Sequence, residues 1–164
     1  MTQTDSQTRS IFRHAFTFIE VAVVIIIVGI LAAIVVPRFG SVTDEARSAA
    51  TQGVVGSVRA SIAGFRTSRL LAGGAPFPTL AELTASGTVL EQAIPPNPFT
   101  GATAVQAVNV KEAAVRAVSN SEKFGWNYYV DNAATPPVSI FYSNCETSTT
   151  VVGPKGTTQK ASEL

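Results

Sequence analysis

The chain of 164 residues has one cysteine and one histidine. Because Cys145 has no second cysteine to pair with, the chain cannot form an intrachain disulfide. A catalytic thiol needs a base such as histidine beside it, and the only histidine, His14, lies near the N-terminus. We therefore interpret Cys145 as a buried small hydrophobic residue, which is a common setting for a free cysteine.

Charge is also scarce. Charged residues make up 14% of the chain, and the formal net charge is +1. Lysine and arginine are scattered along the sequence, so there is no basic patch of the kind that binds nucleic acid. The sequence also lacks a phosphate-binding glycine motif and paired carboxylates outside its predicted helices. It therefore predicts a protein that is not an enzyme, needs no cofactor and binds no nucleic acid.

What the chain does contain is a long apolar run, from Phe16 to Val36, with a single charged residue, Glu20. As an α-helix these residues would extend roughly 31 Å, which is about the thickness of the hydrocarbon core of a bilayer. An ionisable group inside such a helix is costly and by default marks function. The alternatives are a secretory signal peptide, whose apolar region is usually shorter, a plain membrane anchor, and a buried core helix.

The segment RHAFTFIEVAVVIIIVGILAAIVVPRFG, residues 13–40, resembles the N-terminus of the type IV pilin and type II secretion pseudopilin superfamily. In that family a prepilin peptidase removes a short basic leader, and the new N-terminus is a methylated phenylalanine. The resemblance therefore implies a leader at residues 1–15, cleavage between Ala15 and Phe16, and N-methylation of Phe16. Ala15 departs from the glycine that usually precedes the cut.

The same resemblance places the family's conserved glutamate at Glu20, a helix glycine at Gly29 and a helix-bending proline at Pro37. An unpaired carboxylate in a medium of low dielectric costs several kcal/mol. We therefore expect Glu20 of one subunit to pair with the Phe16 amine of another and to set the register of a filament. The alternative is that Glu20 lies close enough to the membrane surface for its side chain to reach water.

Proline lacks a backbone donor, so Pro37 should kink the helix or end it. Beyond it, apolar and small residues recur every three or four positions, which predicts an amphipathic helix with a buried stripe. We expect one long kinked helix, with a transmembrane and assembly half at residues 16–37 and an amphipathic half at 38–70. The expected stripe consists of Phe39, Val42, Ala46, Ala49, Gly53, Val54, Val58, Ile62 and Phe65.

Residues 71–164 are predicted to form a small head. The segment from Gly73 to Pro76 should end the long helix, and Thr79 with Glu82 matches a capping box at the start of a short helix. The three prolines between Ile94 and Gly101 predict a loop.

Two aromatic and β-branched segments, residues 123–130 and 137–144, predict an antiparallel hairpin. Residues 105–118 fit helix or strand equally well, and the polar tail at residues 147–164 should be loose. Together these features predict an α+β fold in which the long helix packs on a head with an antiparallel sheet. The aromatic residues expected to fill the head are Trp126, Tyr128, Tyr129, Phe141 and Tyr142.

The stretches PFPT and PPNPFTG resemble the head of the major type II secretion pseudopilin. The resemblance implies a structural subunit of a helical homo-oligomer, the pseudopilus, that drives protein export. Its implied partners are minor pseudopilins, prepilin peptidase, an inner-membrane platform, an assembly ATPase and membrane lipid. It implies a single-pass protein of the inner membrane with its head in the periplasm. The alternatives are a major or minor subunit of a type IV pilus, and an anchored binding module that does not polymerise.

Major pseudopilins often hold a calcium ion near the C-terminus, whereas this chain has few acidic residues there. After Asp131 the only acids are Glu146 and Glu163. A calcium site needs about six to eight oxygen ligands. We therefore predict no metal site, although Asn132 and Asn144 could contribute oxygens.

Overall fold

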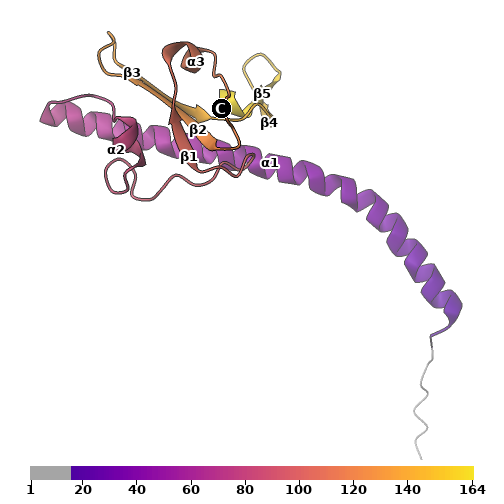
Figure 1. The fold of residues 1–164 in the computed structure, drawn as a ribbon. Coiled ribbons are helices and arrows are strands. Elements are labelled where there is room, and N and C mark those ends of the chain that lie inside the picture. The colour runs from indigo at the N-terminus through magenta and orange to yellow at the C-terminus, as the bar shows by residue number, and fades with distance from the viewer. Residues whose placement is uncertain (1–15) are drawn as a thin grey trace, which may run out of the picture. The chain divides into compact units, whose positions relative to one another are not determined.

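The computed structural model describes residues 16–164, apart from the side chains of residues 36–41. The described chain begins with a long helix, which short helices and strands follow (Figure 1). Contacts between residues divide it into two compact units, with the boundary after Gly40. The elements are α1 (Phe18–Ala72), α2 (Leu80–Thr84), β1 (Ala104–Ala107), α3 (Val110–Ala114), β2 (Phe124–Asp131), β3 (Val138–Ser143), β4 (Ser148–Val152), β5 (Thr158–Lys160) and the 3-10 turn η1 (Ala161–Glu163).

Helix α1 is 55 residues long, within two residues of the predicted helix at each end. Its backbone remains helical through Pro37. Pro37 therefore does not end the helix, and the kink expected there stays a prediction.

Local signals set both ends of α1. At the start, the Thr17 hydroxyl accepts a hydrogen bond from the Glu20 backbone N–H at 3.3 Å, which satisfies one of the free N–H groups of a first helical turn. At the end, Gly73 and Gly74 have φ values of 72° and 150°. Residues with a Cβ rarely adopt these conformations, so the chain leaves the helix where glycine permits it.

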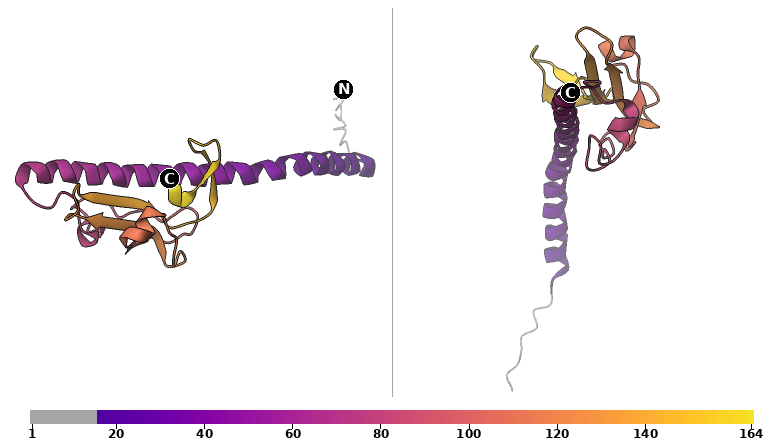
Figure 2. Two further views of the ribbon diagram at one scale, coloured as in Figure 1. Left: turned by 90° about the horizontal axis from the view of Figure 1, so that it is seen from above. Right: turned by 90° about the vertical axis from the view of Figure 1, so that its left-hand side faces the viewer.

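The core of the second unit, residues 41–164, lies between α1 and one face of a three-stranded sheet (Figures 1 and 2). The rings of Trp126 and Phe141 stack with their centroids 5.6 Å apart. Four of the five aromatic residues predicted to fill the head are fully buried, and Tyr129 is partly buried, which largely confirms that prediction. The main cluster comprises Val55, Val58, Ile62, Phe77, Leu83, Ile94, Trp126, Tyr128 and Phe141.

The face of α1 that the head covers differs in part from the predicted stripe. Ser48 and Thr51 are buried. Their hydroxyls donate to main-chain oxygens one turn earlier, Asp44 O at 2.7 Å and Arg47 O at 2.9 Å. A buried hydroxyl satisfied in this way loses little on burial. The buried positions are Ser48, Thr51, Val55, Val58 and Ile62, whereas Val42, Ala46, Ala49 and Gly53 of the predicted stripe are exposed.

The sheet has the strand order β1-β2-β3. Strands β2 and β3 pair antiparallel from Trp126 and Ser143 to Asp131 and Val138, as the sequence predicts. Strand β1 pairs with β2 in parallel, so the sheet is mixed and not purely antiparallel. The α+β class is confirmed.

The ambiguous segment, residues 105–118, contains most of β1 and all of α3. It divides at Asn109, whose side chain accepts a hydrogen bond from the Glu112 N–H at 3.0 Å, while the Glu112 carboxylate accepts from the Asn109 N–H at 2.9 Å. This capping box starts α3 directly after the strand.

A polar network covers the second face of the sheet. Asn127 and Asn144 are fully buried, and the Asn127 amide donates to Asn144 Oδ1 and to Ala117 O, both at 3.1 Å. The hydroxyl of Tyr142 donates to the same Ala117 oxygen at 3.0 Å. Burial raises the pKa of the Tyr142 phenol, so the hydroxyl stays a donor. The network attaches the segment after α3 to the sheet.

Two predictions in the region between α1 and the sheet are confirmed. Thr79 and Glu82 form a capping box at the start of α2, and residues 94–101 contain no helix or strand. Within that loop Asn97 is fully buried and donates to Gly125 O at 2.7 Å and to Ser143 Oγ at 2.8 Å.

The tail is folded, contrary to the prediction that residues 147–164 are loose. Strands β4 and β5 pair antiparallel, and Ala161 and Ser162 are buried. The Thr150 N–H donates to the Ser48 hydroxyl on α1 at 3.2 Å. This hydrogen bond joins residues 102 positions apart, and the local sequence carries no signal of it.

Candidate functional site

The apolar part of α1 is the first candidate site. Residues Phe18–Val35 have a mean hydropathy of 3.1, and none of this stretch is buried within the protein. Valine and isoleucine side chains along it are about half exposed or more. A helix that is apolar on all sides and uncovered loses free energy in water, and a membrane or other helices would cover it. In the part of the chain that the structure describes, this is the one helix long and apolar enough to cross a membrane.

Glu20 lies in the first turn of this helix and is exposed. Its backbone N–H is held by Thr17, through the hydroxyl at 3.3 Å and the main-chain oxygen at 3.1 Å. Among the described residues, no cation lies within ion-pair distance of its carboxylate. The helix therefore fixes the position of Glu20, and no cation of the described residues pairs with its carboxylate.

The other predicted assembly residues are placed as follows. Phe16 precedes the helix and is exposed. A Cβ added at Gly29 would meet nothing within 4 Å, so the absence of a side chain there leaves room for a neighbour to approach closely. The side chain of Pro37 and the whole of Ala15 lie outside the described residues.

Cys145 is buried, as predicted. Its Sγ donates to Thr147 Oγ1 at 3.2 Å and accepts from the Thr147 N–H at 3.4 Å. Among residues 16–164, no three His, Cys, Asp or Glu side chains gather closely enough to hold a metal ion.

A second candidate site, which sequence reasoning missed, is a cavity lined by Arg59, Arg66 and Arg116. The three arginines come from two segments separated by about 50 positions in the chain, so no sequence motif unites them. The one local signal is periodicity: Arg59 and Arg66 are seven residues apart, which places them on one face of a helix.

One characterised protein resembles part of this chain. Over 48 residues the chain is 50% identical to the type IV narrow pilus major component PilA5 of Thermus thermophilus. The match covers 29% of this chain and 41% of that protein, so it spans less than half the length of the relative. No family model matches the chain. No solved structure matches it significantly.

Proposed function

We propose that this chain is a structural subunit of a membrane-rooted filament of the type IV pilin kind and that it polymerises through the apolar part of α1. The observation that carries the proposal is an uncovered apolar helix whose one carboxylate, Glu20, has no partner among the described residues. The similarity to a pilus component supports it. A core that lies wholly within residues 41–164 supports a unit that keeps its fold while the apolar part of α1 packs elsewhere.

The proposed chemistry begins with removal of residues 1–15 by a prepilin peptidase. Hydrolysis of the Ala15–Phe16 peptide bond leaves a carboxylate on Ala15 and an ammonium on Phe16. A methyl donor then transfers one methyl group to the amine, which releases a proton, and the N-methylammonium of Phe16 pairs with Glu20 of a neighbouring subunit. Since both charges enter a medium of low dielectric, each is costly alone and the pair is favourable relative to either unpaired group. Subunits then add in one register.

The decisive variant is Glu20→Ala. We expect it to insert into the membrane at the wild-type level, because removing a charge makes the helix more apolar, and to yield few or no filaments. The measurements are membrane fractionation and counting of sheared filaments by electron microscopy. The matched control is Glu45→Ala, which removes an exposed acid from the same helix outside the apolar stretch and should assemble normally. Normal assembly of the Glu20→Ala variant would refute the proposed register mechanism.

Processing is tested separately by the mass of the N-terminal peptide. The proposal expects a mature chain that begins at N-methylated Phe16. An intact N-terminus, or a cut within the apolar run, would contradict it and would favour an ordinary anchor or signal peptide.

Two observations favour different kinds of filament, one a surface pilus and the other a periplasmic pseudopilus. The relative is a pilus component, which favours the pilus, whereas the stretches PFPT and PPNPFTG favour the pseudopilus. Deleting the gene distinguishes them: loss of surface filaments with normal secretion supports a pilus, and loss of secreted proteins supports a pseudopilus.

A further inference from the structure

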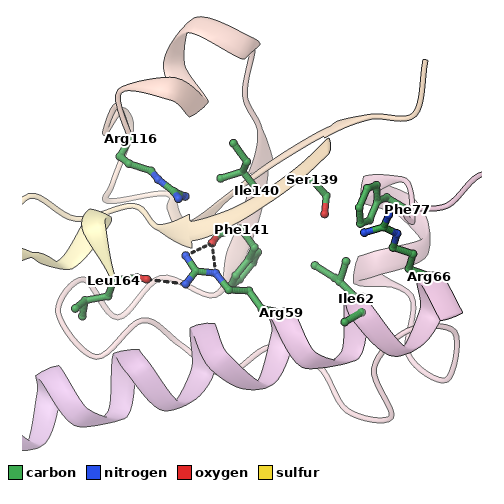
Figure 3. Close-up of a pocket in the computed structure, with 10 residues that line it drawn as sticks. Arg59, Ile62, Arg66, Phe77, Arg116, Ser139, Ile140, Phe141 and Leu164 are labelled. Carbon is green, nitrogen blue, oxygen red and sulfur yellow. Dashed lines mark hydrogen bonds between the residues drawn. The ribbon is translucent and has the colours of Figure 1, made fainter. Parts of the chain in front are cut away.

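The arginine cavity, which we define by Arg59, Arg66 and Arg116, lies between α1 and strand β3 (Figure 3). Its volume is about 320 Å³, equivalent to roughly ten water molecules, which is enough for a small organic molecule. Its walls combine these three arginines and one serine with apolar side chains, and no acidic side chain of the described residues lines it. The remaining lining residues are Ile62, Ala63, Phe77, Ser139, Ile140, Phe141 and Leu164.

Arg59 is already bound to main-chain oxygens. Its Nε and Nη2 donate to Phe141 O at 3.2 and 3.0 Å, and its Nη1 donates to Leu164 O at 2.7 Å (Figure 3). These bonds fix the guanidinium at one end of the cavity. Burial, followed by the charge of Arg116, lowers the pKa of Arg59 from its ordinary value, so a like charge lies close by.

The Arg116 side chain has no oxygen acceptor among the described residues. Its guanidinium lies over the Tyr142 ring at 5.1 Å from the centroid, and its Nη1 is buried without a hydrogen-bond partner. Its backbone has a φ of 53°, a conformation that costs a non-glycine residue energy and that is often found at functional sites. A buried, unpartnered donor and a strained backbone at one residue indicate a role other than stability.

Arg66 lies at the opposite end of the cavity, over the ring of Phe77 at 5.0 Å (Figure 3). Cation–π contact uses the flat face of a guanidinium, so the N–H groups in its plane remain free to donate. Arg59 and Arg66 are two helical turns apart, which separates the two cationic ends by about 10 Å along α1. Ile62 of α1 lies between the two ends (Figure 3).

We propose that the arginine cavity binds a small organic anion with an acidic group at each end of a short apolar chain. One acidic group accepts from Arg116 and from the free donors of Arg59, and the other accepts from Arg66. The apolar middle of the ligand packs on the apolar side chains of the lining, and the acidic group at the Arg116 end accepts from the accessible donors of that guanidinium.

The test uses the full chain in detergent micelles and follows thermal unfolding through the fluorescence of its one tryptophan, Trp126. The probes are pimelate, which has two carboxylates, heptanoate, which has one, and 1,7-heptanediol, which has none, all at matched ionic strength. A ligand that binds only the folded state raises the midpoint in a saturable way. We expect a saturable rise with pimelate, a smaller one with heptanoate and none with the diol.

Substitutions locate the effect. Arg116→Gln and Arg66→Gln should each weaken pimelate binding by about tenfold or more, since each removes hydrogen bonds to a charged group. Arg47→Gln, which removes the same charge from an exposed position on α1, should bind as the wild type does. Because Arg66 is exposed, its variant tests the proposal even if Arg116→Gln fails to fold. No saturable shift, equal binding of pimelate and heptanoate, or wild-type binding by the Arg66 variant would overturn the proposal.

Discussion

Single residues in the head carry conformations and hydrogen bonds that substitutions can test one at a time. The clearest case is Arg116, whose φ of 53° lies in the left-handed region. Asn120 has a φ of 50°, and asparagine tolerates this region better than other residues with a Cβ. Asparagine at position 120 thus suits a left-handed backbone, whereas arginine at position 116 does not.

Replacing Arg116 by asparagine should therefore stabilise the head relative to replacing it by glutamine. Both changes remove the charge, so the difference between them reports the backbone alone. We expect the asparagine variant to be more stable by about 1 kcal/mol, because strained conformations of this kind cost of order 1–3 kcal/mol. Urea unfolding in detergent measures the difference, and equal stabilities would show that the backbone there is unstrained.

Asn97→Ala should be strongly destabilising. The change leaves Ser143 Oγ buried without the donor that Asn97 supplies, and it removes the acceptor of the Phe99 N–H, 2.9 Å away. Gly125 O loses one of its two donors and keeps the Asn144 N–H at 2.9 Å. Unsatisfied buried groups cost roughly 1–3 kcal/mol each, so we expect a loss of about 2–4 kcal/mol by urea unfolding. Gln52→Ala, at an exposed position on α1, is the matched control, and a similar small loss in both variants would contradict this account.

At the scale of elements, the capping box of α2 predicts a pH dependence. The Glu82 carboxylate accepts from the Thr79 N–H at 2.8 Å and from the Thr79 hydroxyl at 2.9 Å. The backbone hydrogen bond from Thr79, followed by that from its hydroxyl, lowers the pKa of Glu82 below its ordinary value. Because the pKa of Glu82 is lower in the folded state than in the unfolded state, its ionised form stabilises the fold at pH values above the unfolded pKa. This stabilisation is lost as the pH falls through the folded pKa.

We expect Glu82→Gln to lose less stability than the wild type as the pH falls below about 4.5, the ordinary value for this group. The difference should be at most about 1 kcal/mol, because the carboxylate is near the surface and screened by solvent. Unfolding curves of both proteins across this pH range provide the comparison. Parallel pH profiles would show that the box does not depend on the charge.

The folded tail predicts an order of proteolysis. Lys155 lies in the turn between β4 and β5, whereas Lys160 lies in β5 directly before the buried Ala161. Exposed turns are cut more readily than paired strands. Trypsin should therefore cleave after Lys155 well before Lys160, as mass spectrometry of timed digests can show. Cleavage at both sites at one rate would indicate the loose tail that composition alone predicts.

The sequence predicted those elements whose signals are local. The box of Thr79 and Glu82, the glycines that end α1 and the alternation of β2 and β3 each act within a few residues. The hydroxyl of the buried Ser48 accepts a hydrogen bond from Thr150 of the folded tail, 102 positions later. The sequence near either residue therefore does not predict the contact. The arginine cavity escaped prediction for the same reason, because Arg116 reaches Arg59 only through the fold.

At the scale of the whole molecule, the unit of residues 41–164 should fold without the apolar part of α1. Every member of its core cluster lies in the unit from Ser41 to Leu164. We expect a variant that lacks residues 1–40 to be soluble without detergent and to unfold cooperatively, within about 0.5 kcal/mol of the full chain. Sedimentation and urea unfolding test this, and aggregation or loss of a cooperative transition would contradict it.

The hydrogen bonds of Arg59 also impose an order of events on synthesis. Its acceptors, Phe141 O and Leu164 O, lie 82 and 105 positions later in the chain. Because a chain is made from its N-terminus, the apolar stretch Phe18–Val35 leaves the ribosome long before those acceptors exist. The chain therefore meets a membrane, or fails to meet one, before Arg59 can form the hydrogen bonds that join α1 to β3 and to Leu164.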